Sequence, residues 1–298
     1  MKRKILFFIN PISGTANKKR VADQIINACK KRALEFEIIH TNAEGNYAFL
    51  SEKISAEKIT DVVISGGDGT VSAVTSFLIG SEVNVGIIPQ GSGNGLALAA
   101  GISRNTSQAL ETIFNGKASW IDGFFINNKF SCMLSGLGFD AQVAHDFAQQ
   151  KKRGLLTYIM LCFKHFFSSK NYPFNINVNG TRISEEALFV SVANSNQFGN
   201  KVTIAPKASL SDGLLDLIVV KKTNRLLSAF YLIKHILLGK IQDEVSMMRS
   251  SNKIIYLQSA SLQIENPQKA LLHIDGEPVE TADFIEIKIV PKAFKLLQ

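Results

Sequence analysis

The residues best suited to chemistry form a short glycine turn around one carboxylate. Gly66–Thr70 reads Gly-Gly-Asp-Gly-Thr and directly follows the apolar run Asp61–Ser65. Because glycine lacks a Cβ, the main chain can approach an anion, and the N–H groups of a helix start favour negative charge. The alternative is an ordinary strand–helix turn, but this pattern favours phosphate binding. Asp68 would then serve a nucleotide-bound Mg²⁺ or a water beside the phosphate, and Thr70 would cap the helix.

A second copy of this layout follows shortly afterwards. The apolar run Val83–Pro89 leads into Gly91–Gly95 (Gly-Ser-Gly-Asn-Gly), and Leu96–Ala100 has the composition of a helix start. Two such turns close together in the sequence predict one polyphosphate held from two sides. The Walker A pattern GxxxxGK[ST] is absent, so a P-loop NTPase is not predicted.

Three further patterns are less specific. Gly136–Ala141 matches GxGxxA, but no acidic residue follows at the distance that a dinucleotide site requires, so we discount dinucleotide oxidoreduction. From spacing alone, Asp275–Glu277 reads as a hairpin turn and Ser211–Asp216 as a turn into a strand. The histidines show no metal-binding spacing and are interpreted as structural or solvent-facing.

The composition indicates a globular protein with an anionic partner. The 298 residues are 46% hydrophobic and 19% charged, and the formal net charge is +8. This charge suits a nucleotide, a nucleic acid or an acidic membrane surface. The apolar stretches are too short to span a bilayer and the three cysteines lie far apart, so we expect a cytoplasmic chain with reduced thiols.

A basic run, Lys151–Arg153, precedes the aromatic-rich segment Leu155–Phe167, which is expected to be helical. One interpretation is a solvated charge run before a core helix. The other is an interfacial helix whose basic collar attracts anionic lipid headgroups, in which case membrane association would weaken with salt. Both stay open at this point.

The elements that must position these residues alternate between strand and helix up to about residue 115. Besides the two strands before the glycine turns, strands are expected at Ile5–Ile9 and Glu35–His40, and helices near Lys18–Arg32 and Tyr47–Ser55. This alternation predicts a parallel sheet covered on both faces, which binds ligands outside the carboxyl ends of its strands. Asn10, Thr41 and the two glycine turns lie at such ends and should face one crevice.

From about Ser119 the pattern changes to frequent short strands, which predicts a mostly antiparallel β-sandwich. Asn127-Asn128 and Asn179-Gly180 read as hairpin turns, and helices are expected near Gly154–Phe167 and Leu226–Gly239. Further strands are expected at Phe174–Val178, Ala187–Val192, Leu215–Val220, Ile254–Leu257, Leu262–Glu265, Leu271–Ile274 and Phe284–Val290. We therefore expect a nucleotide-binding α/β domain over residues 1–120 and a β-rich domain over 121–284, with 285–298 returning to the first.

The chain resembles the lipid kinase family that includes diacylglycerol kinases and sphingosine kinases, and is most similar to its small bacterial soluble members. The resemblance extends over nearly the whole sequence. It lies in six motifs: Asn10–Gly14 (Asn-Pro-Ile-Ser-Gly), Gly66–Thr70, Pro89–Asn94, Gly136–Ala141, Ser211–Leu215 and Asp275–Glu277.

This resemblance implies an N-terminal domain like those of 6-phosphofructokinases and NAD kinases, a C-terminal sandwich with a lipid pocket, and ATP·Mg²⁺ between them. It implies that ATP is contacted by Asn10, Thr41, Gly66, Gly67, Asp68, Gly69, Thr70, Val71, Ser72 and Ser92. Asp212 and the carbonyls of Ser209 and Leu214 would hold a Mg²⁺. Glu277 would be the general base on the lipid hydroxyl. In some relatives the aspartate matching Asp68 has that role, so the base stays open between the two.

The predicted reaction transfers the γ-phosphoryl group of ATP to a lipid hydroxyl. Bacterial glycerolipid kinases usually read Gly-Thr-x-Asn-Asp at the second turn, whereas Gly91–Gly95 lacks the aspartate and is more similar to sphingosine kinases. The acceptor is therefore diacylglycerol or a sphingoid lipid, and Asp140 would contact its headgroup. The alternatives are an NAD kinase-like phosphotransferase and a non-catalytic nucleotide- or lipid-binding regulator. The expected partners are the lipid and a peripheral membrane surface, without nucleic acid, and the chain could form a homodimer.

Overall fold

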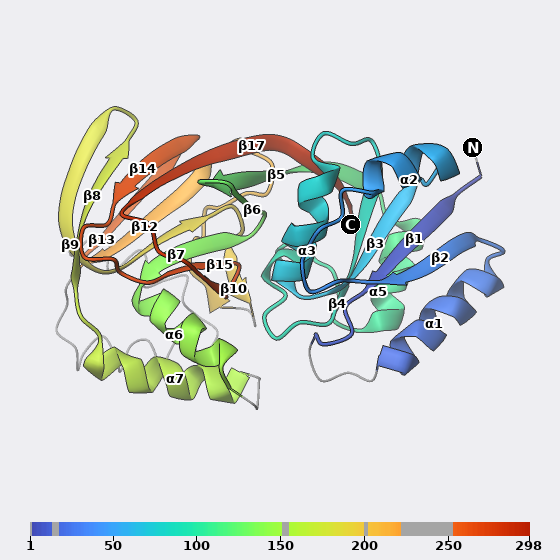
Figure 1. The fold of residues 1–298 in the computed structure, drawn as a ribbon, viewed down its shortest axis with the longest axis horizontal. Helices are drawn as coiled ribbons and strands as arrows, with labels where there is room; N and C mark the ends of the chain where they lie inside the picture. The colour runs from blue at the N-terminus through green and yellow to red at the C-terminus, as the bar shows by residue number, and fades with distance from the viewer. Residues whose placement is uncertain (1, 14–17, 151–154, 200–201, 222–252) are drawn as a thin grey trace.

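The computed structural model describes residues 2–13, 18–150, 155–199, 202–221 and 253–298 (Figure 1). Three predicted features lie outside the described residues: the helix near Leu226–Gly239, the basic run Lys151–Arg153, and Gly14 of the first motif.

Parallel strands form the N-terminal part of the sheet. β1 (Lys4–Ile9), β2 (Glu35–His40), β3 (Asp61–Gly66) and β4 (Asn84–Pro89) lie in the order β4-β3-β1-β2. Apart from a first residue in β1 and β4, the strands β1, β3 and β4 are buried, as expected for parallel strands covered on both faces. The predicted α/β class with a parallel sheet is confirmed.

Helices cover both faces of these strands. They are α1 (Lys18–Lys31), α2 (Leu50–Glu57), α3 (Asp68–Thr75), α4 (Gly95–Ala99) and α5 (Thr106–Asn115). Because strand side chains alternate, Phe7 packs with α1 and α5, whereas Phe8 packs with α2 and α3 on the other face. α2 begins later than predicted, since Tyr47 packs against Phe8 from the preceding loop. α5 is absent from the predicted helices, and Asn105 caps it by accepting two amide hydrogen bonds.

The C-terminal half is a mostly antiparallel sandwich, as predicted. Its longer strands are β5 (Ala118–Ile126), β7 (Leu134–Gly138), β8 (Tyr172–Val178), β9 (Thr181–Ala193), β12 (Leu215–Lys221), β13 (Ile254–Ser259), β14 (Ser261–Glu265) and β17 (Phe284–Leu297). Its shorter strands are β6 (Lys129–Ser131), β10 (Gln197–Gly199), β11 (Val202–Thr203), β15 (Leu272–Ile274) and β16 (Glu277–Val279). Both residues of the Asn179-Gly180 turn have positive φ, which confirms the predicted hairpin.

The last strand, β17, joins the two halves into one sheet (Figure 1). It pairs antiparallel with β5 and β14, and near its end Lys295 and Leu296 pair in parallel with Asn84 and Val85 of β4. The strand was expected at Phe284–Val290, and Pro291, which cannot donate to a ladder, follows that range. A register shift between Val290 and Phe294 accommodates the proline, and the strand continues to Leu297.

Two helices lie against the sandwich, α6 (Phe139–Ala148) and α7 (Leu155–Ser168). α6 packs against the β15–β16 hairpin, and α7 packs against α6 through a cluster that includes Phe139, Val143 and Phe166. α7 matches the helix predicted near Gly154–Phe167, whereas α6 was not predicted. None of the described helices combines the length and the apolar character that crossing a bilayer requires.

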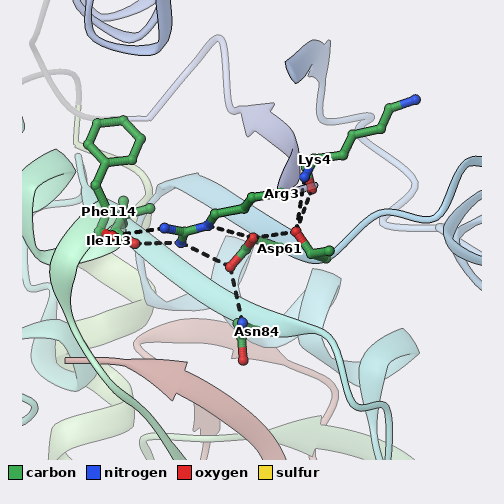
Figure 2. Close-up of polar contacts among 7 residues, drawn as sticks. Arg3, Lys4, Asp61, Asn84, Ile113 and Phe114 are labelled. Atoms are coloured by element: carbon green, nitrogen blue, oxygen red, sulfur yellow. Dashed lines mark hydrogen bonds and ion pairs between the residues drawn. The ribbon is translucent and has the colours of Figure 1, made fainter. Parts of the chain in front are cut away.

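An ion pair lies at the amino ends of the parallel strands, whereas the glycine turns lie at their carboxyl ends (Figure 2). The guanidinium of Arg3 binds both oxygens of Asp61, at 2.8 and 3.0 Å, and donates to the last carbonyls of α5, those of Ile113 and Phe114. Asn84 donates to Asp61 as well, at 3.1 Å. The cluster therefore ties α5 to the amino ends of β3 and β4.

Replacing Arg3 by alanine should lower the free energy of unfolding by about 2 kcal/mol, because the buried Asp61 carboxylate would lose its cation. Urea unfolding measures the change. The control is Arg182→Ala, which removes a pair that is exposed on both sides and should cost well under about 1 kcal/mol. Equal losses in the two variants would contradict a structural role for the Arg3 cluster.

Candidate active site

The carboxyl ends of adjacent parallel strands bring the predicted nucleotide residues together. Asn10 follows β1, and its amide nitrogen Nδ2 donates to Thr70 Oγ1 at 2.7 Å. The main chain joins the same ends, since Asn10 N donates to Ser65 O and Thr41 N donates to Ile9 O. These contacts bring the ends of β1, β2 and β3 together, and that the turns face one crevice stays a prediction.

The two glycine turns touch each other through their main chains. A Cβ on Gly91 would lie 2.5 Å from the Cα of Gly67, so a side chain at this position is excluded. Gln90 N donates to Gly66 O at 2.8 Å. The second turn is closed by Asn94, whose side chain bonds both the N–H and the carbonyl of Gly91 at 2.7 Å.

Asp68 ties the two turns together. Its carboxylate accepts hydrogen bonds from the amides of Gly95, at 3.0 Å, and Leu96, at 3.1 Å. Burial raises the pKa of the Asp68 carboxyl, although these amides lower it in part. Both oxygens therefore already serve the second turn, which makes Asp68 a structural link as well as a candidate for chemistry.

The helix after the first turn begins earlier than expected. α3 starts at Asp68 with Gly67 as its N-cap residue, and no side chain caps it. The prediction that Thr70 caps this helix is therefore wrong, since its hydroxyl is bound to Asn10 instead. The earlier start turns the side chains of Val71 and Ser72 into the interior, where both are buried. Val71 N already donates to Gly67 O at 3.0 Å and the Ser72 hydroxyl is bound to Asp275, so these groups are engaged inside the protein.

Ser72 leads to a buried carboxylate that the sequence analysis assigned no role. Its hydroxyl donates to Asp275 Oδ2, while Ser131 Oγ donates to Asp275 Oδ1 at 2.6 Å and Leu134 N to the same oxygen at 3.2 Å. Burial raises the pKa of Asp275 to about 7, against these hydrogen bonds. Asp275 thus connects α3 to the sandwich, from positions that no local sequence pattern relates.

The Asp275-Gly276 turn presents Glu277 to the first glycine turn. Both turn residues have positive φ, 51° and 78°, so Asp275–Glu277 is the hairpin turn that its spacing predicts. A Cβ on Gly69 would lie 2.5 Å from Glu277 Oε1, which means that the carboxylate lies directly over Gly69. Glu277 is exposed, and the structure therefore brings it together with the Asp68 turn.

The proposed metal residues lie in a different turn. In Ser209–Leu214, Asp212 Oδ1 accepts from Leu214 N at 3.0 Å, and Gly213 N donates to Asp122 Oδ2 at 2.8 Å. Asp122, at the start of the sandwich, was not among the predicted site residues. No three His, Cys, Asp or Glu side chains in the described ranges gather into a metal site. The carboxylate and carbonyl oxygens of this turn are nonetheless the ligand types that Mg²⁺ takes.

Two family models together match most of the chain. Residues 4–126 match the diacylglycerol kinase catalytic domain, and residues 134–298 match the YegS C-terminal NAD kinase beta sandwich-like domain. The two-part fold and these matches define the class, and the chain belongs to the family of diacylglycerol kinases and YegS-like lipid kinases.

Named relatives agree with this assignment. The chain is 28% identical over 314 residues to a diacylglycerol kinase of Mycobacterium tuberculosis (strain ATCC 25618 / H37Rv), covering 99% of this chain and 95% of the relative. It is 26% identical over 284 residues to the diacylglycerol kinase of Bacillus subtilis (strain 168), covering 93% and 90%. A crystal structure of a diacylglycerol kinase from Bacillus anthracis str. Sterne has the same fold, with a TM-score of 0.77 at 23% identity over 99% of this chain and 96% of that one.

The raised pKa of Asp275 predicts a dependence of stability on pH. The folded protein holds this proton up to about pH 7, whereas the unfolded chain loses it near the ordinary pKa of 3.8. The free energy of unfolding therefore falls as pH rises between these values. Asp275→Asn cannot ionise, and asparagine tolerates the positive φ. The stability of this variant relative to wild type should therefore be higher at pH 8 than at pH 5.

Urea unfolding at both pH values measures this difference. The exposed Asp283 supplies the control, and Asp283→Asn should leave the wild-type pH dependence unchanged. A stability difference between Asp275→Asn and wild type that stays constant from pH 5 to pH 8 would contradict the assignment.

Proposed function

We propose that the protein is an ATP-dependent kinase that phosphorylates a lipid hydroxyl where its two halves meet. The observation that carries the proposal is the position of Glu277, a carboxylate of the sandwich that lies over Gly69 in the first glycine turn. A γ-phosphoryl group held by the glycine turns would thus be next to a base from the other half. Family membership supports the same reaction.

The triphosphate is proposed to bind main-chain amides of the first glycine turn and of Ser92 in the second, because the amides of Gly91, Gly95 and Leu96 already donate within the protein. The contact between Gly67 and Gly91 brings the two turns together, so that one anion could reach both. Asn10, Thr41, Thr70 and Ser92 would complete the nucleotide contacts. Mg²⁺ bound with the nucleotide would neutralise developing charge, and Asp212 with the Ser209 and Leu214 carbonyls would hold a supporting ion.

The two candidate carboxylates are proposed to have different roles. Both oxygens of Asp68 accept amide hydrogen bonds, so Asp68 aligns the turns, and its carboxylate would serve the nucleotide-bound Mg²⁺. Glu277 is exposed and would accept the proton of the lipid hydroxyl as the oxygen–phosphorus bond forms and ADP leaves. This division favours Glu277 as the general base.

The acceptor is proposed to be diacylglycerol or a sphingoid lipid.

Two domains are proposed. Residues 1–120 with 285–298 would bind nucleotide, and residues 121–284 would bind lipid. The pairing of β17 with β4 supports the assignment of the C-terminal segment to the nucleotide domain.

An NAD kinase-like activity and a regulator without catalysis are the competing functions. Incubation of the protein with Mg²⁺, labelled ATP and diacylglycerol, a sphingoid base or NAD distinguishes all three.

Replacing either carboxylate should slow phosphoryl transfer. Glu277→Gln should lower kcat at least about tenfold because it removes the base, and Asp68→Asn at least about tenfold because asparagine leaves one amide of the second turn without an acceptor. Transfer of labelled phosphate from ATP to lipid measures kcat. Thermal unfolding checks that each variant is folded.

Glu280→Gln is the matched control, since Glu280 is another exposed glutamate close to the same hairpin, and its kcat should equal that of wild type. Near-normal turnover in Glu277→Gln would remove Glu277 from the mechanism, and the same result for Asp68→Asn would remove Asp68.

The outer face of α7 is proposed to place the protein on the cytoplasmic membrane surface. Leu156, Met160 and Phe163 recur at helical spacing and are 79%, 72% and 49% exposed, while Cys162 and Phe166 pack inward. The exposed Lys164 adjoins this stripe and is attracted to anionic headgroups. Three partly exposed side chains, at most about 200 Å² each, offer less than the ~800 Å² per partner of a stable dimer.

Phe163→Glu should weaken co-sedimentation with vesicles of anionic phospholipid by about tenfold, because it places a charge in the apolar stripe. The matched control is Phe284→Glu, the same change at a phenylalanine that is also 49% exposed, and it should bind as wild type. Equal binding by both variants would contradict the proposal. A change of oligomeric state in Phe163→Glu, measured by analytical ultracentrifugation, would assign the stripe to a dimer instead.

A further inference from the structure

The turn that carries Glu277 is held at both of its central residues, by different groups. Asp275 binds Ser72, Ser131 and the main chain of Leu134, which fixes the turn to the interior. Gly276 has φ 78°, and nothing lies within 4 Å of the place where its Cβ would be. Packing therefore does not hold this glycine, and its peptide group needs another restraint.

That restraint is the imidazole of His273. Gly276 N lies 3.2 Å from His273 Nδ1. A main-chain N–H can only donate, so Nδ1 must be the acceptor, and the proton of the neutral ring is on Nε2. Nε2 in turn faces Asp140 Oδ2 at 3.4 Å. The ring therefore has one defined tautomer, with its two nitrogens engaged on opposite sides.

Asp140 is itself fixed at the start of α6. Its other oxygen accepts a hydrogen bond from Ala141 N at 2.8 Å, and the Asp140 and His273 side chains are 5% and 2% exposed. A path of contacts thus leads from α6 through the buried side chains of Asp140 and His273 to the Asp275–Gly276 peptide. These contacts of Asp140 and His273 lead to α6 and Gly276, so we expect the KM for ATP not to depend on them.

We propose that His273 is a positioning residue that aims Glu277 at the acceptor hydroxyl by holding the Gly276 amide through Nδ1. This inference rests on the proposed kinase function. Asp140 orients the ring and selects its tautomer. The role differs from that of Asp275, which attaches the turn to α3 but leaves the direction of the next peptide open.

Two variants of similar size separate the two nitrogens. In His273→Asn, the side-chain oxygen can take the place of Nδ1 and accept from Gly276. In His273→Gln, the amide nitrogen can take the place of Nε2 and donate to Asp140. We expect kcat of His273→Asn to stay within about twofold of wild type and kcat of His273→Gln to fall about tenfold, with the KM for ATP unchanged in both. Equal losses, the reverse order, or an increased KM for ATP would overturn the proposal.

A measurement that needs no turnover completes the test. Nitrogen-15 NMR of the wild-type protein at neutral pH should show His273 with its proton on Nε2, and the Gly276 amide resonance should shift in His273→Gln more than in His273→Asn. A proton on Nδ1 would overturn the positioning role even in an active kinase. If no lipid is phosphorylated while the Nε2 tautomer and the amide shifts are found, the proposed function fails and the restraint on Gly276 stands.

Discussion

The arrangement of the site depends on one buried carboxylate that bridges the two halves of the chain. Asp275 accepts hydrogen bonds from Ser72 on α3 and from Ser131 on β6, so the hairpin with Glu277 cannot leave the first glycine turn without breaking both. Burying a carboxylate is unfavourable, and the raised pKa of Asp275 reflects that cost. Hydroxyl and amide donors make the cost tolerable, and β17 adds a covalent and hydrogen-bonded link between the same halves.

Features encoded by neighbouring residues could be predicted from the sequence. The parallel strands follow from apolar runs that end in glycine turns, and the Asn179-Gly180 hairpin follows from a turn whose residues accept positive φ. Strand order at the carboxyl ends then brings Asn10 to Thr70. The β-sandwich was predictable from the frequency of short strands, because such alternation reflects burial on one face and is visible within a few residues.

What could not be predicted depends on contacts between distant segments or on helix phase. α3 begins at Asp68, which turns Ser72 inward to a partner on the last hairpin. Nothing near Ser72 or Asp275 in the sequence signals that bond. Gly136–Ala141, which covers the start of α6, was compared with a nucleotide-binding pattern instead. The helix α6 was missed because its apolar residues pack on α7 and on the sandwich rather than on a single local neighbour. Asp122 was missed for the same reason, since its partner Gly213 lies far along the chain.

Differences in hydrogen bonding and exposure explain why two carboxylates at one site can have different roles. A carboxylate that accepts main-chain amides on both oxygens is held in place and has fewer lone pairs for a substrate proton, which describes Asp68. A glutamate at the exposed end of a rigid turn can approach an incoming hydroxyl, which describes Glu277. Rigidity must then come from the turn rather than from the glutamate, and in this fold Asp275 supplies part of it by attaching the hairpin to α3. The buried acid that titrates near neutral pH is thus a consequence of holding an exposed base in position.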